Sequence, residues 1–384
     1  MGIVDFQAIE PCPHRPPCPG CPRYGEAGLA PAAVARLAAL AAKAGLPPPR
    51  VLEGARFQYR LRARLMVRGR SLSPRIGIFE AGSHRVVDMP HCRVHHPLVN
   101  RVAAAARAAI RATRTRPYAE RSHEGLLRAL QVVVERQSQT AQLVLVGNGG
   151  DPAPLEPLAE AMAAALGSAL HSLWWNGQPA RSNVILGPHW RRWLGPEAVR
   201  ETIGGVEVFF PPGAFGQSHL DLADQIVGRV HDWVPAGARI AELYAGCGAI
   251  GLGLLRRCAA LVLNESAPDA LRGLALGLAA RPEPERARAR IAAGAAGELA
   301  RELVSGAELA IVDPPRKGLD PPLLDALCAA PPARLAYLSC DLDSFERDAA
   351  RLLAGGRLQL AELCAYDLFP NTAHVETLAR FEAV

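Results

Sequence analysis

The chain has 384 residues, of which 49% are hydrophobic, so it is long enough for two or three globular domains, each with its own core. Its 43 Lys and Arg residues outnumber its 37 Asp and Glu residues, and the resulting net charge of +6 favours a polyanionic partner. We see no run of 18 apolar residues and no signal peptide, so we expect a cytoplasmic location and no membrane partner.

Residues 12–21 form a cysteine-rich segment in which Cys12, Cys18 and Cys21 follow a C-x5-C-x2-C spacing. The prolines and glycines of this segment disfavour helix and strand, so stiff loops hold the thiols. In a reducing compartment, clustered thiols act as metal ligands more often than as disulfides. The segment therefore predicts a metal centre, either zinc or an iron–sulfur cluster.

A centre of either kind needs a fourth ligand. The nearest further cysteine is Cys92, in the segment MPHCR. A zinc site that uses His14 or His91 is the alternative, and the spacing alone does not separate the two metals.

The region up to about residue 208 has the pattern of an antiparallel α+β domain. Residues 57–68 (FQYRLRARLMVR) alternate apolar and basic residues with the period of a strand, so Arg60, Arg62 and Arg64 share one face. Such a row is either a solvated surface or one that tracks phosphates, and the basic residues nearby favour the second. Further strands are expected at 75–79, 84–89, 130–135, 141–146 and 170–175, and helices at 29–44, 98–113 and 155–166.

Residues 239–255 (RIAELYAGCGAIGLGLL) predict a strand, a glycine-rich turn and a helix. The turn lets the backbone approach a ligand closely, although a glycine loop by itself also fits a dinucleotide. A second strand, at 261–265, ends at Glu265, where a carboxylate can accept hydrogen bonds from ribose hydroxyls. Glu242, Tyr244 and Glu265 together fit a nucleoside derivative of methionine at least as well as NAD.

Two more segments point to the same cofactor site. Gln217 ends the segment FFPPGAFGQ directly before a helix expected at 220–233, so its amide side chain either reaches a ligand or lies on the surface. A weaker third strand is expected at 289–292, and a fourth strand, at 308–312, runs into Asp313 of the segment DPPRKG. The prolines hold the backbone rigid there, with a simple turn as the alternative reading.

A fifth strand, at 336–338 in the segment LAYLSCDLDSF, ends just before Cys340 and leaves this thiol at a loop tip. Taken alone, such a cysteine is more often an apolar filler than a nucleophile. The carboxyl ends of strands in an α/β sheet meet at one edge, so Cys340 shares that edge with the glycine loop, Glu265 and Asp313. This convergence predicts a nucleophilic cysteine.

Four motifs of the carboxyl-terminal half, in this order, resemble those of the RNA 5-methyluridine methyltransferases: ELYAGCGAIGL, IVDPPRKGLD, YLSCDLDSFERD and DLFPNTAHVE. The cysteine segment, Cys92 and the arginine strand are similar to the iron–sulfur members of this family, so the resemblance covers almost the whole chain. It implies S-adenosyl-L-methionine-dependent methylation of carbon 5 of a uridine. The implied fold is α/β, with a Rossmann-like class I methyltransferase domain at 209–384. An α+β RNA-binding region with an iron–sulfur loop precedes it at 1–208.

The resemblance also implies roles for individual residues. It implies Cys340 as the nucleophile and Glu376 as the general base. Contacts to S-adenosyl-L-methionine are implied at Gln217, Tyr244, Ala249, Glu265 and Asp313. A 4Fe-4S cluster is implied on Cys12, Cys18, Cys21 and Cys92.

The chain departs from the family at three places. Only eleven residues precede Cys12, so we expect no oligonucleotide-binding-like barrel ahead of the cysteine segment. Residues 293–296 read AGAA where the family usually has Asp or Asn, and Ala249 stands where a polar residue or glycine is frequent. We therefore expect a weakened contact to the adenine of the cofactor.

The expected partner is RNA, with 23S ribosomal RNA favoured over transfer RNA, and the expected state is a monomer. Methylation of uridine in transfer RNA is one alternative. A non-catalytic RNA-binding protein on a methyltransferase fold is another, and Ala295 is the feature that keeps it open. The third is a methyltransferase that acts on another base or on a small molecule.

Overall fold

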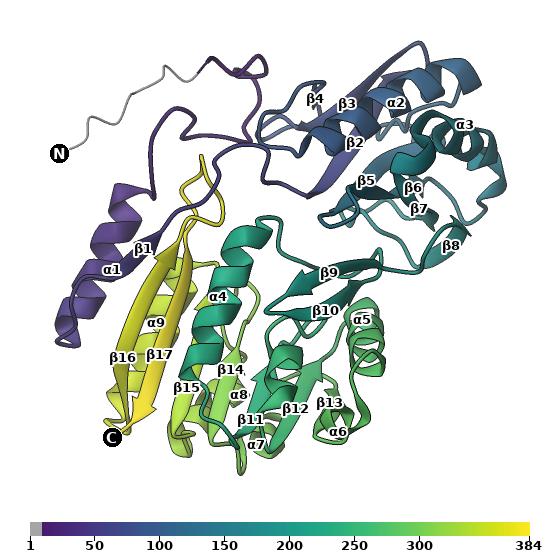
Figure 1. Cartoon of the computed structure of the whole chain (residues 1–384). Coiled ribbons are helices and arrows are strands. Elements are labelled where there is room, and N and C mark those ends of the chain that lie inside the picture. Colours follow the sequence, from purple (N-terminus) through teal and green to yellow (C-terminus); the bar gives the residue numbers. More distant parts are fainter. Residues whose placement is uncertain (1–9) are drawn as a thin grey trace. The chain divides into compact units, whose positions relative to one another are not determined.

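The computed structural model describes residues 10–384 and separates into two compact units (Figure 1). Of the described residues, unit 1 comprises 10–27 and Ala55–Val199, and unit 2 comprises Gly28–Gly54 and Arg200–Val384. These units differ from the expected regions 1–208 and 209–384, because residues 28–54 add a helix and a strand to unit 2. Residues 1–9 of the expected first region lie outside the described residues.

Unit 1 is built on a seven-stranded sheet with the strand order β4-β3-β2-β5-β6-β7-β8. Neighbouring strands are antiparallel except β6 and β7, which run parallel because α3 crosses between them. Its strands are β2 (Arg62–Arg70), β3 (Ser73–Phe79), β4 (Val86–Asp88), β5 (Leu127–Glu135), β6 (Thr140–Gly147), β7 (Leu170–Gly177) and β8 (His189–Leu194), and its helices are α2 (Pro97–Thr113) and α3 (Glu156–Leu166). The strands and helices predicted within this unit are confirmed, except that the strand expected at 57–68 begins only at Arg62, so Arg60 lies ahead of it.

Unit 2 is built on an eight-stranded sheet with the order β1-β16-β17-β15-β14-β11-β12-β13. The strands are β1 (Arg50–Leu52), β11 (Arg239–Leu243), β12 (Ala260–Glu265), β13 (Ala289–Ala293), β14 (Leu309–Val312), β15 (Arg334–Ser339), β16 (Leu358–Tyr366) and β17 (Glu376–Ala383). The helices are α1 (Pro31–Lys43), α4 (Leu220–Trp233), α5 (Pro268–Ala279), α6 (Glu283–Arg286), α7 (Ala300–Val304), α8 (Pro321–Ala329) and α9 (Leu342–Ala354). A separate hairpin of β9 (Val199–Ile203) and β10 (Val206–Phe210) turns at two glycines.

The five strands predicted from the carboxyl-terminal half form the parallel part of this sheet, from β11 to β15. Strand order reverses between β11 and β14, and ligands bind at such a switch point, beyond the carboxyl ends of the strands. Strands β16 and β17 were not predicted. Because β17 runs antiparallel to β15, the amino-terminal end of β17 reaches the same edge as the carboxyl end of β15.

The helix expected after the glycine turn is instead a short 3-10 helix, Gly251–Arg256. A Cβ atom at Gly251 would lie 2.0 Å from Oε2 of Glu242, and one at Gly253 would lie 2.5 Å from the ring of His231. Glycine is required at both positions because the chain packs too closely for a side chain. This close packing brings the segment directly against the buried carboxyl group of Glu242.

One arginine near the predicted basic row in unit 1 has a structural role. The guanidinium carbon of Arg68 lies 5.3 Å from the ring centre of Phe79 and 5.1 Å from that of Tyr118, and the same side chain forms an ion pair with Glu120. Arg64 donates to the side chain of Gln131 across the sheet. The phosphate-tracking surface therefore stays a prediction for the rest of the row.

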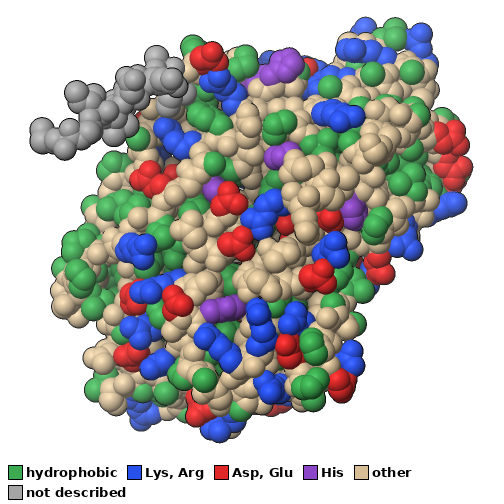
Figure 2. Space-filling model, in the orientation of Figure 1, with side chains coloured by type: hydrophobic (Ala, Val, Ile, Leu, Met, Phe, Trp, Pro, Cys, Tyr) green, Lys and Arg blue, Asp and Glu red, His purple; other side chains and the backbone are tan. Residues whose placement is uncertain are grey.

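The surface and the helices bear on the expected partners. On the face drawn in Figure 2, basic and acidic side chains are intermingled, so the net charge of +6 is not gathered into one field there. Among residues 10–384, no helix combines the length and the apolar character needed to cross a bilayer.

A buried carboxylate in unit 2 holds the loop between β14 and α8. Asp348 has no exposed surface, and its Oδ2 accepts hydrogen bonds from the backbone N–H of Leu319 and from the Tyr337 hydroxyl, both at 2.8 Å. Its Oδ1 accepts from the guanidinium of Arg347. A Cβ atom at Gly318 would lie 2.4 Å from Oδ2, so the loop lies directly on this carboxylate.

We expect the substitution Asp348→Ala to lower the free energy of unfolding by about 3 kcal/mol, because it leaves buried donors and a cation without their acceptor. Urea denaturation followed by circular dichroism measures the change. Asp325→Ala, which breaks an exposed ion pair with Arg351, is the matched control and should cost well under about 1 kcal/mol. Equal losses in the two variants would contradict a special role for Asp348.

Candidate active site

Chemically active side chains collect at the edge of the unit 2 sheet where the parallel strands end. Tyr244 follows β11, Glu265 ends β12, Asp313 follows β14 and Cys340 follows β15. Glu376 begins β17 at the same edge, where Thr377 pairs with Ser339. The fold thus brings together five residues that are far apart in the sequence.

Cys340 is half-buried beside acidic neighbours. Burial, followed by the nearby carboxyl groups of Glu376 and Asp313, raises the pKa of this thiol to about 11. The guanidinium of Arg316 acts in the opposite direction and lowers the thiol pKa. The thiol is therefore protonated at neutral pH in the free protein, and a partner has to take up its proton before it can act as a nucleophile.

Glu376 is a carboxyl group with no exposed surface, and neither of its oxygens has a hydrogen-bond partner among the described residues. Burial and then the Asp313 carboxyl raise the pKa of Glu376 well above its ordinary value. Burial raises the pKa of Asp313 itself to about 7. Unpartnered buried carboxyl groups of this kind are costly, and they cluster at functional sites.

Glu242 is a third buried acid behind the same edge. It is 3% exposed, and its Oε2 has no hydrogen-bond partner in the part of the chain that the structure describes. Burial, and then the proximity of Asp313, raises the pKa of Glu242 to about 8, although the backbone of Gly251 lowers it in part. Asp313 and Glu242 can therefore exchange a proton near neutral pH.

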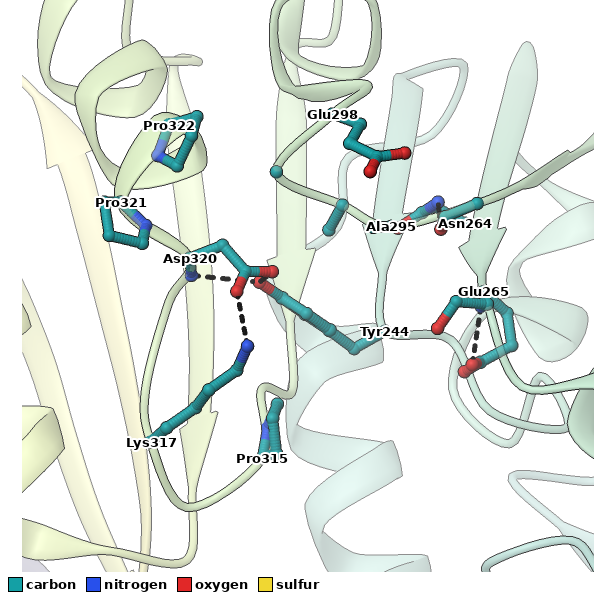
Figure 3. Close-up of a pocket in the computed structure, with 14 residues that line it drawn as sticks. Tyr244, Asn264, Glu265, Ala295, Glu298, Pro315, Lys317, Asp320, Pro321 and Pro322 are labelled. Carbon is teal, nitrogen blue, oxygen red and sulfur yellow. Dashed lines mark hydrogen bonds and ion pairs between the residues drawn. The ribbon is translucent and has the colours of Figure 1, made fainter.

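A cavity of about 520 Å³ opens at the ends of β11, β12 and β13 (Figure 3). Tyr244 lies across it between Asp320 and Glu265. The residues that line it are Tyr244, Asn264, Glu265, Ser266, Gly294, Ala295, Ala296, Gly297, Glu298, Pro315, Lys317, Asp320, Pro321 and Pro322. Its volume and mixed polar and apolar lining suit a nucleoside-sized ligand.

The carboxylate of Glu265 is fixed by backbone donors. It accepts from the N–H of Gly246 in the glycine turn at 2.8 Å, and from the N–H groups of Ser266 and Ala267 at 2.7 Å. These bonds tie the turn to the end of β12 and hold the carboxylate against the cavity wall. An acid placed in this way can also accept from ligand hydroxyls.

The structure separates the predicted cofactor residues into two groups. Tyr244 and Glu265 line the cavity, whereas Asp313 does not line it and lies near Cys340. Gln217 is half-buried in the loop between β10 and α4, and Ala249 lies in the turn after β11; neither lines the cavity.

Two residues of the cavity wall were missed. Lys317 and Asp320 lie three positions apart in the segment DPPRKGLD and form an ion pair at 2.6 Å. The ion-pair spacing was visible in the sequence, but the approach of Asp320 to Tyr244, 76 residues away, was not.

The four predicted cluster cysteines all lie in unit 1. Cys18 and Cys21 pack against a buried apolar group that contains Cys92. Burial, and then the nearby thiols of Cys92, Cys18 and Cys12, raises the pKa of Cys21 to about 12. Within residues 10–384 no group of three or more His, Cys, Asp or Glu side chains is placed to hold a metal ion, so the metal centre stays a prediction.

The histidines of the zinc alternative lie next to these cysteines. His14 is buried, and its Nε2 accepts a hydrogen bond from the backbone N–H of His91 at 3.3 Å. This bond occupies Nε2, so a metal at His14 would have to bind the other ring nitrogen, Nδ1.

Comparisons with known proteins identify relatives that match most of the chain. No protein-family model matches it. It is 34% identical over 340 residues to an uncharacterized RNA methyltransferase of Protochlamydia amoebophila, and the match covers 87% of this chain and 88% of the relative. A second uncharacterized RNA methyltransferase, from Geobacter sulfurreducens, is 32% identical over 345 residues, and the match covers 88% of this chain but 67% of that relative.

Among solved structures, the chain is similar to the Pyrococcus abyssi tRNA (uracil-54, C5)-methyltransferase in complex with S-adenosyl-L-homocysteine. The TM-score is 0.75 with 23% sequence identity, over 91% of this chain and 81% of that chain. This similarity confirms the predicted fold class, an α/β fold with a Rossmann-like methyltransferase as neighbour.

The charges around Cys340 predict opposite effects of two substitutions on alkylation of its thiol in the free protein. At pH 9 roughly one thiol in a hundred is ionised. Arg316→Gln removes a cation, raises the thiol pKa and should slow alkylation about threefold. Asp313→Asn removes an anion and should accelerate it about threefold.

Iodoacetamide labelling at pH 9, read for the Cys340 peptide by mass spectrometry, measures both rates. The peptide of the half-buried Cys328, whose rate should stay constant, is the internal control. A change in the same direction in both variants would contradict the electrostatic account.

Proposed function

The chain belongs to the RNA methyltransferase family, and from this premise we propose that it transfers a methyl group from S-adenosyl-L-methionine to carbon 5 of a uridine in RNA. The observation that carries the proposal is the placement of the Cys340 thiol beside the buried, unpartnered carboxyl group of Glu376 at the sheet edge. Carbon 5 of uracil is a poor nucleophile, so its methylation needs both a nucleophile to activate the ring and a base to finish the reaction.

In the first step, the Cys340 thiol gives up its proton to a neighbouring carboxylate and the sulfur adds to carbon 6 of the uracil. The ring electrons then form an enolate, whose carbon 5 takes the methyl group and leaves the donor as a neutral thioether. The donor, when bound, supplies a methyl group activated by its sulfonium charge. Asp313, whose pKa burial raises to about 7, is the proton acceptor in this step, which leaves Glu376 to act in the second.

In the second step, the carboxylate of Glu376 removes the proton from carbon 5, the carbon 5–carbon 6 double bond returns, and the Cys340 thiolate leaves. A high pKa makes the ionised form of Glu376 a strong base. Its burial keeps water away from the covalent intermediate. Because the target ring has to reach a half-buried thiol, the uridine must be rotated out of its base stack.

The donor fits the cavity beside this cluster. Tyr244 offers an aromatic wall for the adenine ring, and Glu265 is placed to accept from the ribose hydroxyls. We also propose contacts from Gln217, Ala249 and Asp313, which lie outside the cavity lining. Ala295 lines the wall without a polar side chain, which supports the expectation of a weaker contact to adenine.

A 4Fe-4S cluster on Cys12, Cys18, Cys21 and Cys92 is part of the proposal. The fit rests on the donor set: four thiols within mutual electrostatic reach, with that of Cys21 having a pKa of about 12. The Cys21 thiol is protonated at neutral pH, and iron binding would displace its proton and hold the loops together. The cluster would stabilise unit 1.

The proposed substrate is a uridine of 23S ribosomal RNA, based on the resemblance to the iron–sulfur members of the family. Transfer RNA is the alternative, supported by the similarity of fold to a transfer RNA uracil-5 methyltransferase.

The covalent mechanism predicts different outcomes for Cys340→Ala and Glu376→Gln on transcribed ribosomal and transfer RNA with a radiolabelled methyl donor. Cys340→Ala should abolish methyl transfer, by at least about a thousandfold, because the ring is not activated. Glu376→Gln should accumulate a covalent protein–RNA adduct because the carbon 5 proton stays in place. Label incorporation and denaturing gel shifts measure these outcomes.

The variant Cys328→Ala, at a half-buried cysteine of α8, is the control and should behave as the wild type. Turnover by Cys340→Ala would overturn the nucleophile assignment. Wild-type protein that binds RNA without methylating it would favour the non-catalytic alternative, and methyl groups on another base would favour a different substrate.

The cluster proposal predicts that protein purified without oxygen is brown and contains about four iron atoms per chain. Cys92→Ser should remove most of the iron and lower the unfolding temperature, because the loops lose their common tether. Metal analysis and absorbance spectra measure both effects, with Cys258→Ser, a buried cysteine of unit 2, as the control. Stoichiometric zinc without iron would contradict the proposal.

A further inference from the structure

Tyr244 and Asp320 are locked together by two hydrogen bonds in the wall of the cavity. The Tyr244 hydroxyl donates to Oδ2 of Asp320 at 3.0 Å. The backbone N–H of Asp320 donates back to the same hydroxyl oxygen at 3.2 Å. Both the donor and the acceptor capacity of the phenol are thereby used, so the ring is fixed at its far end (Figure 3).

The near end of the Tyr244 side chain is fixed by an unusual backbone. Its φ angle is +60°, in the left-handed region that non-glycine residues seldom occupy and that costs of order 1 kcal/mol or more. This conformation turns the ring out of the strand direction and across the cavity. Backbone strain of this kind persists where the surroundings hold it, and the Asp320 bonds supply such a constraint.

Asp320 is itself held on two sides. Its other oxygen, Oδ1, accepts from the ammonium of Lys317 at 2.6 Å. The preceding residue, Leu319, donates its backbone N–H to the buried Asp348. Burial alone would raise the pKa of Asp320, but the hydrogen bonds from Lys317 and Tyr244 outweigh it and lower the pKa. The carboxylate is therefore a charged and immobile anchor for the phenol.

We propose that Asp320 is a positioning residue for the methyl donor: it holds the Tyr244 ring as a preformed wall against which the flat base of the donor packs. The inference rests on the proposed function, because it takes the cavity as the donor site. A wall that is already ordered loses little side-chain entropy when the ligand binds, so the anchor acts on donor affinity. Asp320 touches neither the uridine nor the reacting thiol in this account.

A double-mutant cycle on donor binding tests the proposal. Calorimetric titration of the purified full-length chain with S-adenosyl-L-homocysteine, without RNA, gives the dissociation constants. We expect Asp320→Ala and Tyr244→Phe each to raise the constant roughly fivefold to tenfold. The double variant should bind S-adenosyl-L-homocysteine no more weakly than either single variant, because both substitutions remove the same hydrogen-bonded anchor.

Two further variants separate positioning from general damage. Asp320→Asn keeps an acceptor oxygen for the phenol and should restore affinity to within about twofold of the wild type. Asp325→Ala, on the exposed face of α8, should bind as the wild type does. In methylation assays, Asp320→Ala should raise KM for the donor with little change in kcat, because the reacting groups keep their places.

The outcomes distinguish this inference from the proposed function. Unchanged affinity in a folded Asp320→Ala variant, or effects that add in the double variant, would overturn the positioning role and leave the proposed reaction intact. Conversely, the expected non-additive effects of the two substitutions on S-adenosyl-L-homocysteine binding, together with no methylated uridine, would retain the role of Asp320 and overturn the proposed reaction. No binding of that ligand by the wild type would overturn both.

Discussion

The antiparallel pairing of β15 with β17 is the constraint on which the candidate active site depends. Cys340 follows the last residue of β15 and Glu376 is the first of β17, and the pairing of Ser339 with Thr377 brings the two side by side. Neighbouring residues of a strand point to opposite faces, so a register shift of one residue would turn Glu376 away. On the other side of β17, strand β16 pairs Tyr366 with Glu376. The register of β17 is therefore fixed by both of its neighbouring strands.

Burial gives this edge its chemical character. Burial raises the pKa values of Glu242, Asp313 and Glu376, and the Asp313 carboxyl raises those of Glu242 and Glu376 further. Both Glu242 and Glu376 keep carboxyl oxygens without hydrogen-bond partners in the described residues. Such an arrangement lowers stability, since charges leave water without compensation. The same arrangement suits proton transfer during a reaction, which needs groups that gain and lose protons near neutral pH.

The loop from Asp313 to Asp320 joins the two parts of the site. Asp313 and Arg316 act on the Cys340 thiol, whereas Lys317 and Asp320 form part of the cavity wall. The buried Asp348 accepts a hydrogen bond from the backbone of Leu319 in this loop and another from the Tyr337 hydroxyl of β15. The same carboxylate therefore fixes the position of the loop that carries both the thiol's neighbours and part of the cavity wall. One rigid loop of eight residues thereby keeps the proposed donor beside the proposed nucleophile.

The sequence by itself determined the parallel strands, the glycine turn and the residues that end each strand, because local periodicity and strand ends are encoded within a few neighbouring residues. It also pointed to Cys340 and Glu265 at a common edge. The short 3-10 helix after the glycine turn escaped prediction, because it results from the approach of Glu242 and His231 to two glycines.

Only the tertiary structure decided which distant groups meet. The unpredicted strands β16 and β17, the insertion of residues 28–54 into unit 2 and the pairing of Tyr244 with Asp320 all depend on contacts between segments far apart in the chain. The raised pKa values at the edge have the same origin, because desolvation and the proximity of other charges arise only when the chain packs. A pattern within one segment carries no information about such distances.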